Sequence, residues 1–188
     1  MFNIAVLISG NGTNLQALID ADNGGKWEIK LVVSDNENAF GLKRAARANI
    51  KAMFISKHET GILLEALKEN LINSIVLAGY LSILPGKIIA AYDGKIINIH
   101  PSLIPDFCGK GFYGARVHSA VLKSGVKTTG ATAHFVDEGI DTGPIILQKS
   151  TPVLEGDTVE SLQKRVLQLE HEVLVKAVNI LVDKGAKL

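Results

Sequence analysis

Short apolar runs that alternate with helix-like segments restrict the fold of this sequence more than any other feature. Each run is long enough for one strand and apolar enough to be buried on both faces of a sheet. The runs are Asn3–Ile8, Lys30–Ser34, Ala52–Ile55, Ser74–Ala78 and Lys95–Asn98. Helices are indicated around Leu15–Ile19, at Phe40–Ala48, at Thr60–Leu71 and just after Pro85. This alternation predicts an α/β, Rossmann-like fold with a doubly wound, mostly parallel sheet.

The second half of the chain has a different pattern. Tyr113–Lys123 looks helical, and two extended runs then follow one another, at Thr128–Val136 and Pro144–Val153. Only the turn-rich segment Asp137–Gly143 separates these runs. Two successive strands with a short connection predict a mixed or antiparallel C-terminal edge of the sheet.

A long helix is expected as the last element. Apolar residues recur there at steps of three and four, which predicts one buried stripe. The stripe consists of Val159, Leu162, Val166, Leu169, Val173, Ala177 and Ile180. Asp157 with Glu160 fits a capping box, and Gly185 fits a C-terminal stop. Because no internal repeat or linker interrupts the chain, we expect a single domain over residues 1–188.

Composition and charge argue against several classes of function. The 188 residues are 47% hydrophobic, and 20 basic and 19 acidic residues give a net charge of +1 without long runs of one sign. We therefore expect no binding surface for nucleic acid or for an anionic membrane. No apolar run approaches the ~20 residues of a membrane span, and we expect no leader. The single cysteine, Cys108, suits a reducing compartment, so we expect a cytoplasmic protein.

The loop Gly10–Asn14 separates the first expected strand from the first expected helix. Free N–H groups and the dipole at a helix start favour a bound phosphate. The loop has neither the Gly-Lys-Ser/Thr of a Walker loop nor the spacing of a dinucleotide fingerprint. A plain turn between strand and helix is the alternative. The expected position beyond the carboxyl end of a strand favours ligand binding.

Asn98 and His100 end the fifth expected strand and are two residues apart, so their side chains share one face. Histidine titrates near ~6.5 and can give or take a proton. The amide of Asn98 can donate to a developing oxyanion. Asp141 is the carboxylate that we expect beside His100, where it would raise the pKa of the imidazole. The alternative is that these residues only cap strand ends and turns.

The remaining histidines and the cysteine have simpler interpretations. His134 is predicted to be a core or supporting histidine, because it lies within an apolar strand. His58 and His118 are expected on helices or at their ends, in surface or packing roles. Cys108 carries no signature of a nucleophile. Since no histidines and carboxylates have the spacing of metal ligands, we expect no metal.

These motifs together resemble the folate-dependent formyltransferases, and within them the phosphoribosylglycinamide formyltransferases. The resemblance covers nearly the whole chain and is strongest at Ile8–Gln16, Leu77–Tyr80, Asn98–Pro105 and His134–Pro144. It implies transfer of a formyl group from the co-substrate 10-formyltetrahydrofolate to glycinamide ribonucleotide, in the synthesis of the purine nucleotide IMP. It also implies small-molecule partners only, and a monomer or homodimer.

The resemblance assigns roles to individual residues. The implied catalytic residues are Asn98, His100 and Asp141. The implied ribonucleotide contacts are Gly12, Thr13, Asn14, Pro101 and Glu170. The implied folate contacts are Leu81, Ser82, Ile83, Leu84, Asn98, Asp137, Glu138, Gly139, Ile140, Asp141 and Lys57. A phosphate-binding half, about 1–95, and a catalytic and folate-binding half, about 96–188, would follow. The bond before Pro105 matches a position that is often cis in the family.

The chain departs from the common pattern of the family in three places. Ser82 stands where arginine is frequent, the segment around Lys57 is short, and Phe107–Gly111 replaces a commoner Pro-Gly turn. Other folate enzymes, methionyl-tRNA formyltransferase and formyltetrahydrofolate hydrolase, are the nearest alternatives. They normally carry a further domain, which we do not expect here. A non-catalytic module that binds a phosphorylated metabolite is the alternative from a different class.

Overall fold

A seven-stranded sheet organises the protein, whose computed structural model describes residues 1–22 and 24–185. The strands are β1 (Phe2–Ile8), β2 (Trp27–Ser34), β3 (Lys51–Phe54), β4 (Ser74–Leu77), β5 (Ile96–His100), β6 (Thr128–Phe135) and β7 (Ile145–Pro152). Their order across the sheet is β3-β2-β1-β4-β5-β6-β7. Strands β1 to β5 pair in parallel, whereas β6 is antiparallel to both β5 and β7. The predicted parallel sheet with an antiparallel C-terminal edge is confirmed.

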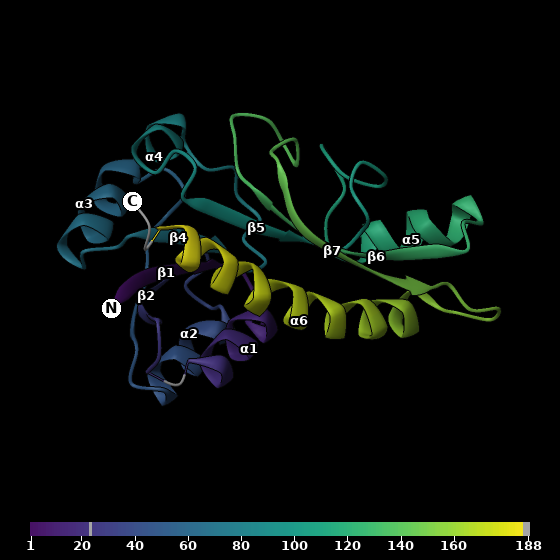
Figure 1. Ribbon diagram of the computed structural model, residues 1–188, viewed down its shortest axis with the longest axis horizontal. Coiled ribbons are helices and arrows are strands. Elements are labelled where there is room, and N and C mark those ends of the chain that lie inside the picture. Colours follow the sequence, from purple (N-terminus) through teal and green to yellow (C-terminus); the bar gives the residue numbers. More distant parts are fainter. Residues whose placement is uncertain (23, 186–188) are drawn as a thin grey trace.

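Helices cover both faces of the sheet (Figure 1). They are α1 (Thr13–Ala21), α2 (Phe40–Arg47), α3 (Thr60–Glu69), α4 (Gly86–Ala91), α5 (Ala115–Ser124) and α6 (Val159–Gly185). The core over one face includes buried residues of α1, α2, α5 and α6, and the core over the other face includes those of α3 and α4. Within the described part of the chain, no helix is both long and apolar enough to cross a membrane.

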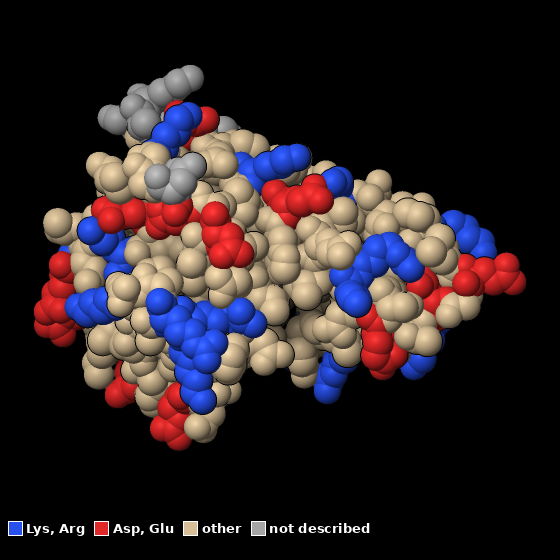
Figure 2. All heavy atoms as spheres, turned by 90° about the horizontal axis from the view of Figure 1, so that it is seen from below, with Lys and Arg blue, Asp and Glu red and all other residues tan. Residues whose placement is uncertain are grey.

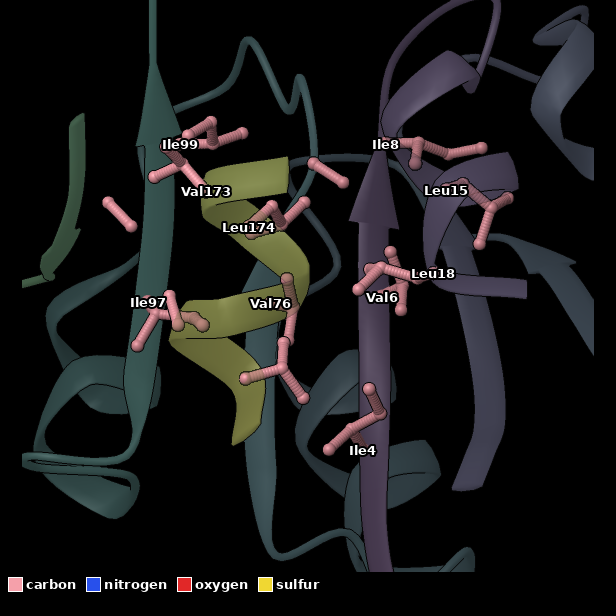
Figure 3. Packing of buried hydrophobic residues seen from close by; sticks show 14 of the residues in the cluster. Ile4, Val6, Ile8, Leu15, Leu18, Val76, Ile97, Ile99, Val173 and Leu174 are labelled. Carbon is pink, nitrogen blue, oxygen red and sulfur yellow. The ribbon is translucent and has the colours of Figure 1, made fainter. Parts of the chain in front are cut away.

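Strand β1 lies at the centre of the sheet, and its side chains alternate between the two cores. Ile4, Val6 and Ile8 belong to the core beneath α1 and α6, whereas Ala5 and Leu7 belong to the core beneath α3 and α4. Figure 3 shows Ile8 and Val6 beside Leu15 and Leu18 of α1, with Val173 and Leu174 of α6 nearer to β5. All five residues from Ile4 to Ile8 are fully buried, which explains why β1 reads as a continuous apolar run rather than an alternating one.

Helix α6 confirms the long C-terminal helix but corrects its details. Its buried side widens toward the C-terminal end, where Leu181 and Val182 are buried while Ile180 is only partly buried. The expected capping box of Asp157 with Glu160 is wrong. Thr158 and Ser161 instead bond each other reciprocally, from each backbone N–H to the other hydroxyl.

Asp157 does not take part in the cap of α6 because its carboxylate has other partners. Its carboxylate accepts hydrogen bonds from Ser161 Oγ and from both terminal nitrogens of Arg165, each at 2.7 Å. The helix includes Gly185, and the stop expected after that residue lies outside the described residues.

The order of the strands defines where a ligand can bind. From β1 the chain proceeds to β2 and β3 on one side, and then returns to β4 on the other side of β1. In open α/β sheets such a switch leaves a crevice beyond the carboxyl ends of the strands. The loop after β1 and the loop after β4 border that crevice, and Ser9 joins them: its N–H donates to Gly79 O, and its Oγ accepts from Leu81 N.

Candidate active site

A cavity of about 430 Å³ lies at the carboxyl ends of β4 and β5. Its walls come from the loop after β4, the end of β5, the loop before α5, the turn between β6 and β7, and one side of α6. From the sites implied by the sequence, the lining includes Leu81, Ser82, Ile83, Leu84, Asn98, His100, Pro101, Asp137, Glu138, Gly139, Ile140, Asp141 and Glu170. The cavity therefore brings together residues that are far apart in the sequence.

Asn98 and His100 share one side of β5, as their spacing predicts. The intervening Ile99 and the preceding Ile97 point into the core instead. Strand β6 is antiparallel and pairs His134 directly opposite Asn98. Side chains directly opposite each other lie on the same face of a sheet, so the end of β5 and the neighbouring β6 present one amide and two imidazoles to the cavity.

Asp141 is the residue that joins this group. One carboxylate oxygen, Oδ2, lies 3.5 Å from His100 Nδ1 and accepts a 2.9 Å hydrogen bond from Gly109 N. The other, Oδ1, lies 3.4 Å from Asn98 Nδ2 and 3.6 Å from His134 Nε2. The backbone of Asp141 is left-handed, with φ of 58°. The turn between β6 and β7 thus delivers the expected carboxylate to the end of β5.

The other ring nitrogen of His100, Nε2, lies 2.9 Å from the carbonyl oxygen of Phe107. A carbonyl can only accept, so Nε2 carries the hydrogen in this contact. Nδ1 is then the nitrogen that changes protonation beside Asp141. His100 is therefore held at Nε2 and faces Asp141 with Nδ1, and only 4% of its surface is exposed.

Asp141 acts to raise the pKa of His100, as expected, but the net shift of that pKa is downward. Burial lowers the pKa of His100, and the nearby His134 lowers it further, while Asp141 and the Phe107 carbonyl oppose the shift without cancelling it. Burial also acts to raise the pKa of Asp141, but His134, His100 and the Gly109 N–H outweigh it and leave that pKa lowered. Near neutral pH the site therefore holds a neutral His100 next to a carboxylate.

His134 is buried beside Asn98, which confirms its interpretation as a core or supporting histidine. Its Nδ1 lies 2.7 Å from the carbonyl oxygen of Phe135, which can only accept, so Nδ1 carries the hydrogen in this contact. Nε2 then offers a lone pair, and Asn98 Nδ2 donates to it at 3.1 Å. This contact fixes which end of the Asn98 amide faces Asp141.

The segment after β5 folds back to hold His100. The Ile104–Pro105 bond is cis, which confirms the expectation at that position. Thr132 Oγ1 donates to Ser102 O at 2.6 Å and accepts from Ile104 N at 3.1 Å. Phe107 has a left-handed backbone with φ of 52°, and its carbonyl reaches back to His100. Burial raises the pKa of the Cys108 thiol, with help from Asp141 and Asp106, which fits a passive thiol.

The loop before α1 lies beside the cavity. Gly12 has φ of 68°, and no side chain caps the helix. The first helical bond runs from Gln16 N to Gly12 O, so the preceding N–H groups of the first turn are not used by the helix. Asn14 Nδ2 donates to Glu170 Oε2 at 2.8 Å. Gly12, Thr13 and Asn14 are not among the residues that line the cavity, but Glu170 lines it and links them to it.

Glu170 is a buried carboxyl group at the wall of the cavity. Its exposed fraction is 8%, and burial raises its pKa against the opposing hydrogen bond from Asn14. The second polar atom of the Asn14 amide, Oδ1, is buried and has no hydrogen-bond partner among the described residues. The Asn14–Glu170 pair therefore keeps unused hydrogen-bonding capacity next to the cavity.

The structure also shows which site residues the sequence did not single out. His118 on α5, Gln163 and Leu167 on α6, and Tyr80 after β4 line the cavity. Burial lowers the pKa of His118 to about 4, with a smaller contribution from His100. The only available signal for His118 was its place between Val117 and Val121, which also face the core.

Two of the implied folate contacts, Lys57 and Ser82, differ in their position relative to the cavity. Lys57 lies in the exposed turn before α3 and is not among the lining residues. Ser82 lines the cavity and donates its hydroxyl to Asp35 Oδ2. In residues 1–22 and 24–185, no group of three histidine, cysteine, aspartate or glutamate side chains gathers as metal ligands would.

Comparison with known proteins identifies the family. A model of the formyl transferase family matches residues 2–178 of the chain. The chain belongs to the formyl transferase family. Among solved structures, glycinamide ribonucleotide transformylase 1 from Symbiobacterium toebii is similar to it with a TM-score of 0.91 and 40% identity, over 98% of this chain and 89% of that chain.

Two curated relatives match within longer proteins. The trifunctional purine biosynthetic protein adenosine-3 of Gallus gallus is 44% identical, over 97% of this chain and 18% of that protein. A chloroplastic phosphoribosylglycinamide formyltransferase of Vigna unguiculata is 37% identical, over 96% of this chain and 61% of that protein. The chain thus spans less than two thirds of the length of these two relatives of the formyl transferase family.

Proposed function

We propose that the chain transfers a formyl group from 10-formyltetrahydrofolate to the amine of glycinamide ribonucleotide, a step of purine biosynthesis. The observation that carries this proposal is the position of Asp141. Its carboxylate faces His100, Asn98 and His134 at the wall of one cavity. The family and the names of the relatives supply the substrates.

The chemistry requires one bond to form and one to break. The amine nitrogen attacks the formyl carbon, the carbonyl oxygen becomes an oxyanion, and the bond from the formyl carbon to N10 then breaks. The amine loses one proton in the course of the reaction and N10 gains one. Burial lowers the pKa of His100 and so keeps the ring neutral, which leaves Nδ1 free to accept the proton and return it to N10.

Asp141 and Asn98 stabilise the charges that develop. When His100 takes the proton, it becomes an imidazolium next to the carboxylate of Asp141, which stabilises it. The hydrogen bond from Asn98 Nδ2 to Asp141 Oδ1 is long, at 3.4 Å, so an oxyanion that comes closer can replace it. Holding both substrates in one cavity makes the attack a local event.

We propose that the phosphate of the ribonucleotide binds at Gly12, Thr13 and Asn14, where unused N–H groups and the helix dipole favour an anion. Glu170 takes the ribose hydroxyls, and Pro101 lines the same cavity. The folate lies between the loop Leu81–Leu84 and the turn Asp137–Asp141.

The proposed folate pocket has apolar walls and a turn that is held by hydrogen bonds to Asp137. Leu81 and Ile83 are 64% and 74% exposed although they line the cavity, so a planar ring system can cover them. Asp137 Oδ1 accepts from Gly139 N and Thr142 Oγ1, which holds the turn in shape. Lys57 is proposed to meet the folate tail outside the cavity.

The single sheet from β1 to β7 supports one formyltransferase domain over residues 1–188. The substrates are small molecules. The thiol of Cys108 is free, which supports a reducing compartment such as the cytoplasm.

A formyl-transfer assay tests the proposed function. The absorbance of 5,8-dideazafolate is followed after mixing the purified chain with 10-formyl-5,8-dideazafolate, with and without glycinamide ribonucleotide. We expect deformylation only when the ribonucleotide is present. Release of formate without it would indicate a hydrolase, and no reaction would indicate a binding module; either result overturns the proposal.

A further inference from the structure

Helix α2 packs directly against the loop that is proposed to bind phosphate. A Cβ added to Gly12 would lie 2.7 Å from the Cα of Gly41, and one added to Gly41 would lie 2.2 Å from Cδ1 of Ile8. Two glycines are therefore needed for the loop and the start of α2 to approach this closely. The contact makes α2 a natural support for the loop, although α2 contributes no residue to the cavity lining.

Helix α2 also binds two consecutive carbonyl oxygens of this loop. Gly41 N donates to Gly10 O at 3.1 Å, and Arg44 Nε donates to Asn11 O at 2.8 Å. The peptide group is planar and trans, so the N–H of each peptide points opposite to its carbonyl. Holding these two carbonyls toward α2 turns the N–H groups of Asn11 and Gly12 away from α2.

The guanidinium of Arg44 is itself fixed by three neighbours. Besides Asn11 O, it donates from Nη1 to Gln16 Oε1 at 3.1 Å, and its Cζ lies 5.1 Å from the centre of the Phe40 ring. A planar guanidinium that donates in two directions and stacks on a ring has one orientation. Lysine, with a single nitrogen, cannot reproduce these contacts.

The positive charge of α2 also favours an anion at the neighbouring loop. Lys43, Arg44 and Arg47 lie on this helix, which has no acidic residue. Figure 2 shows basic side chains gathered on this face of the molecule, where α2 lies. Among the three, Arg44 is the one that contacts the loop, through Asn11.

We propose that Arg44 is a positioning residue for the substrate phosphate, because it orients the Asn11–Gly12 peptide so that its N–H group is presented to the anion. The carbonyl oxygen of Asn11, which would repel a phosphate, is held away in the same way. This inference rests on the proposed function, since it assumes that the loop receives the phosphate of glycinamide ribonucleotide.

The test separates the phosphate from the rest of the substrate. The ratio kcat/KM is measured for glycinamide ribonucleotide and for glycinamide riboside, which lacks the phosphate, with the wild type, Arg44→Lys and Arg44→Met. We expect KM for the ribonucleotide to rise about tenfold to hundredfold in both variants, since a charge-assisted contact is lost. We expect kcat, KM for the folate and kcat/KM for the riboside to stay within about twofold.

Lys43→Met is the matched control, because it removes the same charge from an exposed position of the same helix. It should change KM for the ribonucleotide by less than about twofold. Equal losses for both substrates in Arg44→Met would show a merely structural role, and a wild-type KM in Arg44→Lys would show that charge alone suffices; either result overturns the inference.

An amide spectrum gives a readout that does not depend on turnover. Titration of the wild type with glycinamide ribonucleotide should shift the Gly12 amide resonance, and Arg44→Lys should shift it less at the same saturation. Equal shifts would contradict the inference. If the wild type transfers formyl to the ribonucleotide but these differences are missing, only the role of Arg44 fails; if the wild type transfers none, the proposed function fails.

Discussion

Asn98 and His134 lie directly opposite each other on β5 and β6, and Asn98 Nδ2 is 3.1 Å from His134 Nε2. The carbonyl of Phe135 holds the hydrogen of His134 on Nδ1. The histidine therefore accepts from Asn98 and orients the amide that is proposed to stabilise the oxyanion.

Replacing His134 with phenylalanine should lower kcat about tenfold to hundredfold, with KM for both substrates within about threefold. The ring keeps the packing but offers no lone pair to Asn98. Steady-state kinetics measure the effect, and His134→Gln should recover part of kcat, because an amide oxygen can accept the same hydrogen bond. A wild-type kcat in His134→Phe would remove this role.

Gly12 and Gly10 give a matched pair of substitutions in one loop. Gly12→Ala should lower the free energy of unfolding by about 1–2 kcal/mol or more, because alanine is strained at positive φ and its Cβ meets the backbone of Gly41. Gly10→Ala should stay within about 0.5 kcal/mol, since nothing lies within 4 Å of its added Cβ. Urea denaturation measures both, and equal effects would argue against this packing.

His118 should make the fold sensitive to acid. The unfolded chain protonates this histidine below its ordinary pKa of 6.5, whereas burial lowers the folded pKa to about 4. Protons therefore bind the unfolded state preferentially in this range, and the free energy of unfolding should fall as the pH drops from 6.5 to about 4.

Urea denaturation at several pH values checks the role of His118. His118→Gln should show a smaller decrease over this range than the wild type, whatever its stability at pH 7. His58→Gln, at an exposed position in the turn before α3, is the control and should keep the wild-type dependence. An unchanged dependence in His118→Gln would contradict the role assigned to burial.

The sequence predicted those parts of the fold that depend on local periodicity. Buried parallel strands are continuous apolar runs, so the position of β1 and its neighbours followed from these runs alone. The shared face of Asn98 and His100 followed from the two-residue repeat of a strand. Asp141 was chosen because two glycines let its turn fold tightly over a neighbouring strand end, although Asp137 and Glu138 lie in the same turn.

Other features depend on contacts between distant segments, and the sequence did not reveal them. The pKa of His100 is lowered because packing around β5 removes water, which no spacing rule reports. Arg44 contacts Asn11, which is far away in the sequence, because Gly12 and Gly41 let α2 pack closely against the loop. The cap of α6 lies at Thr158 because Arg165, in the second turn of the helix, binds Asp157.

We propose that the carboxylate of Asp141 drives formyl transfer through His100 and Asn98. The rate at which purified Asp141→Asn forms formylglycinamide ribonucleotide tests this role, and it is measured beside the wild type together with the melting temperature of both. We expect kcat to fall about a hundredfold or more with little change in melting temperature, because the amide cannot stabilise the imidazolium. A kcat near that of the wild type would contradict it.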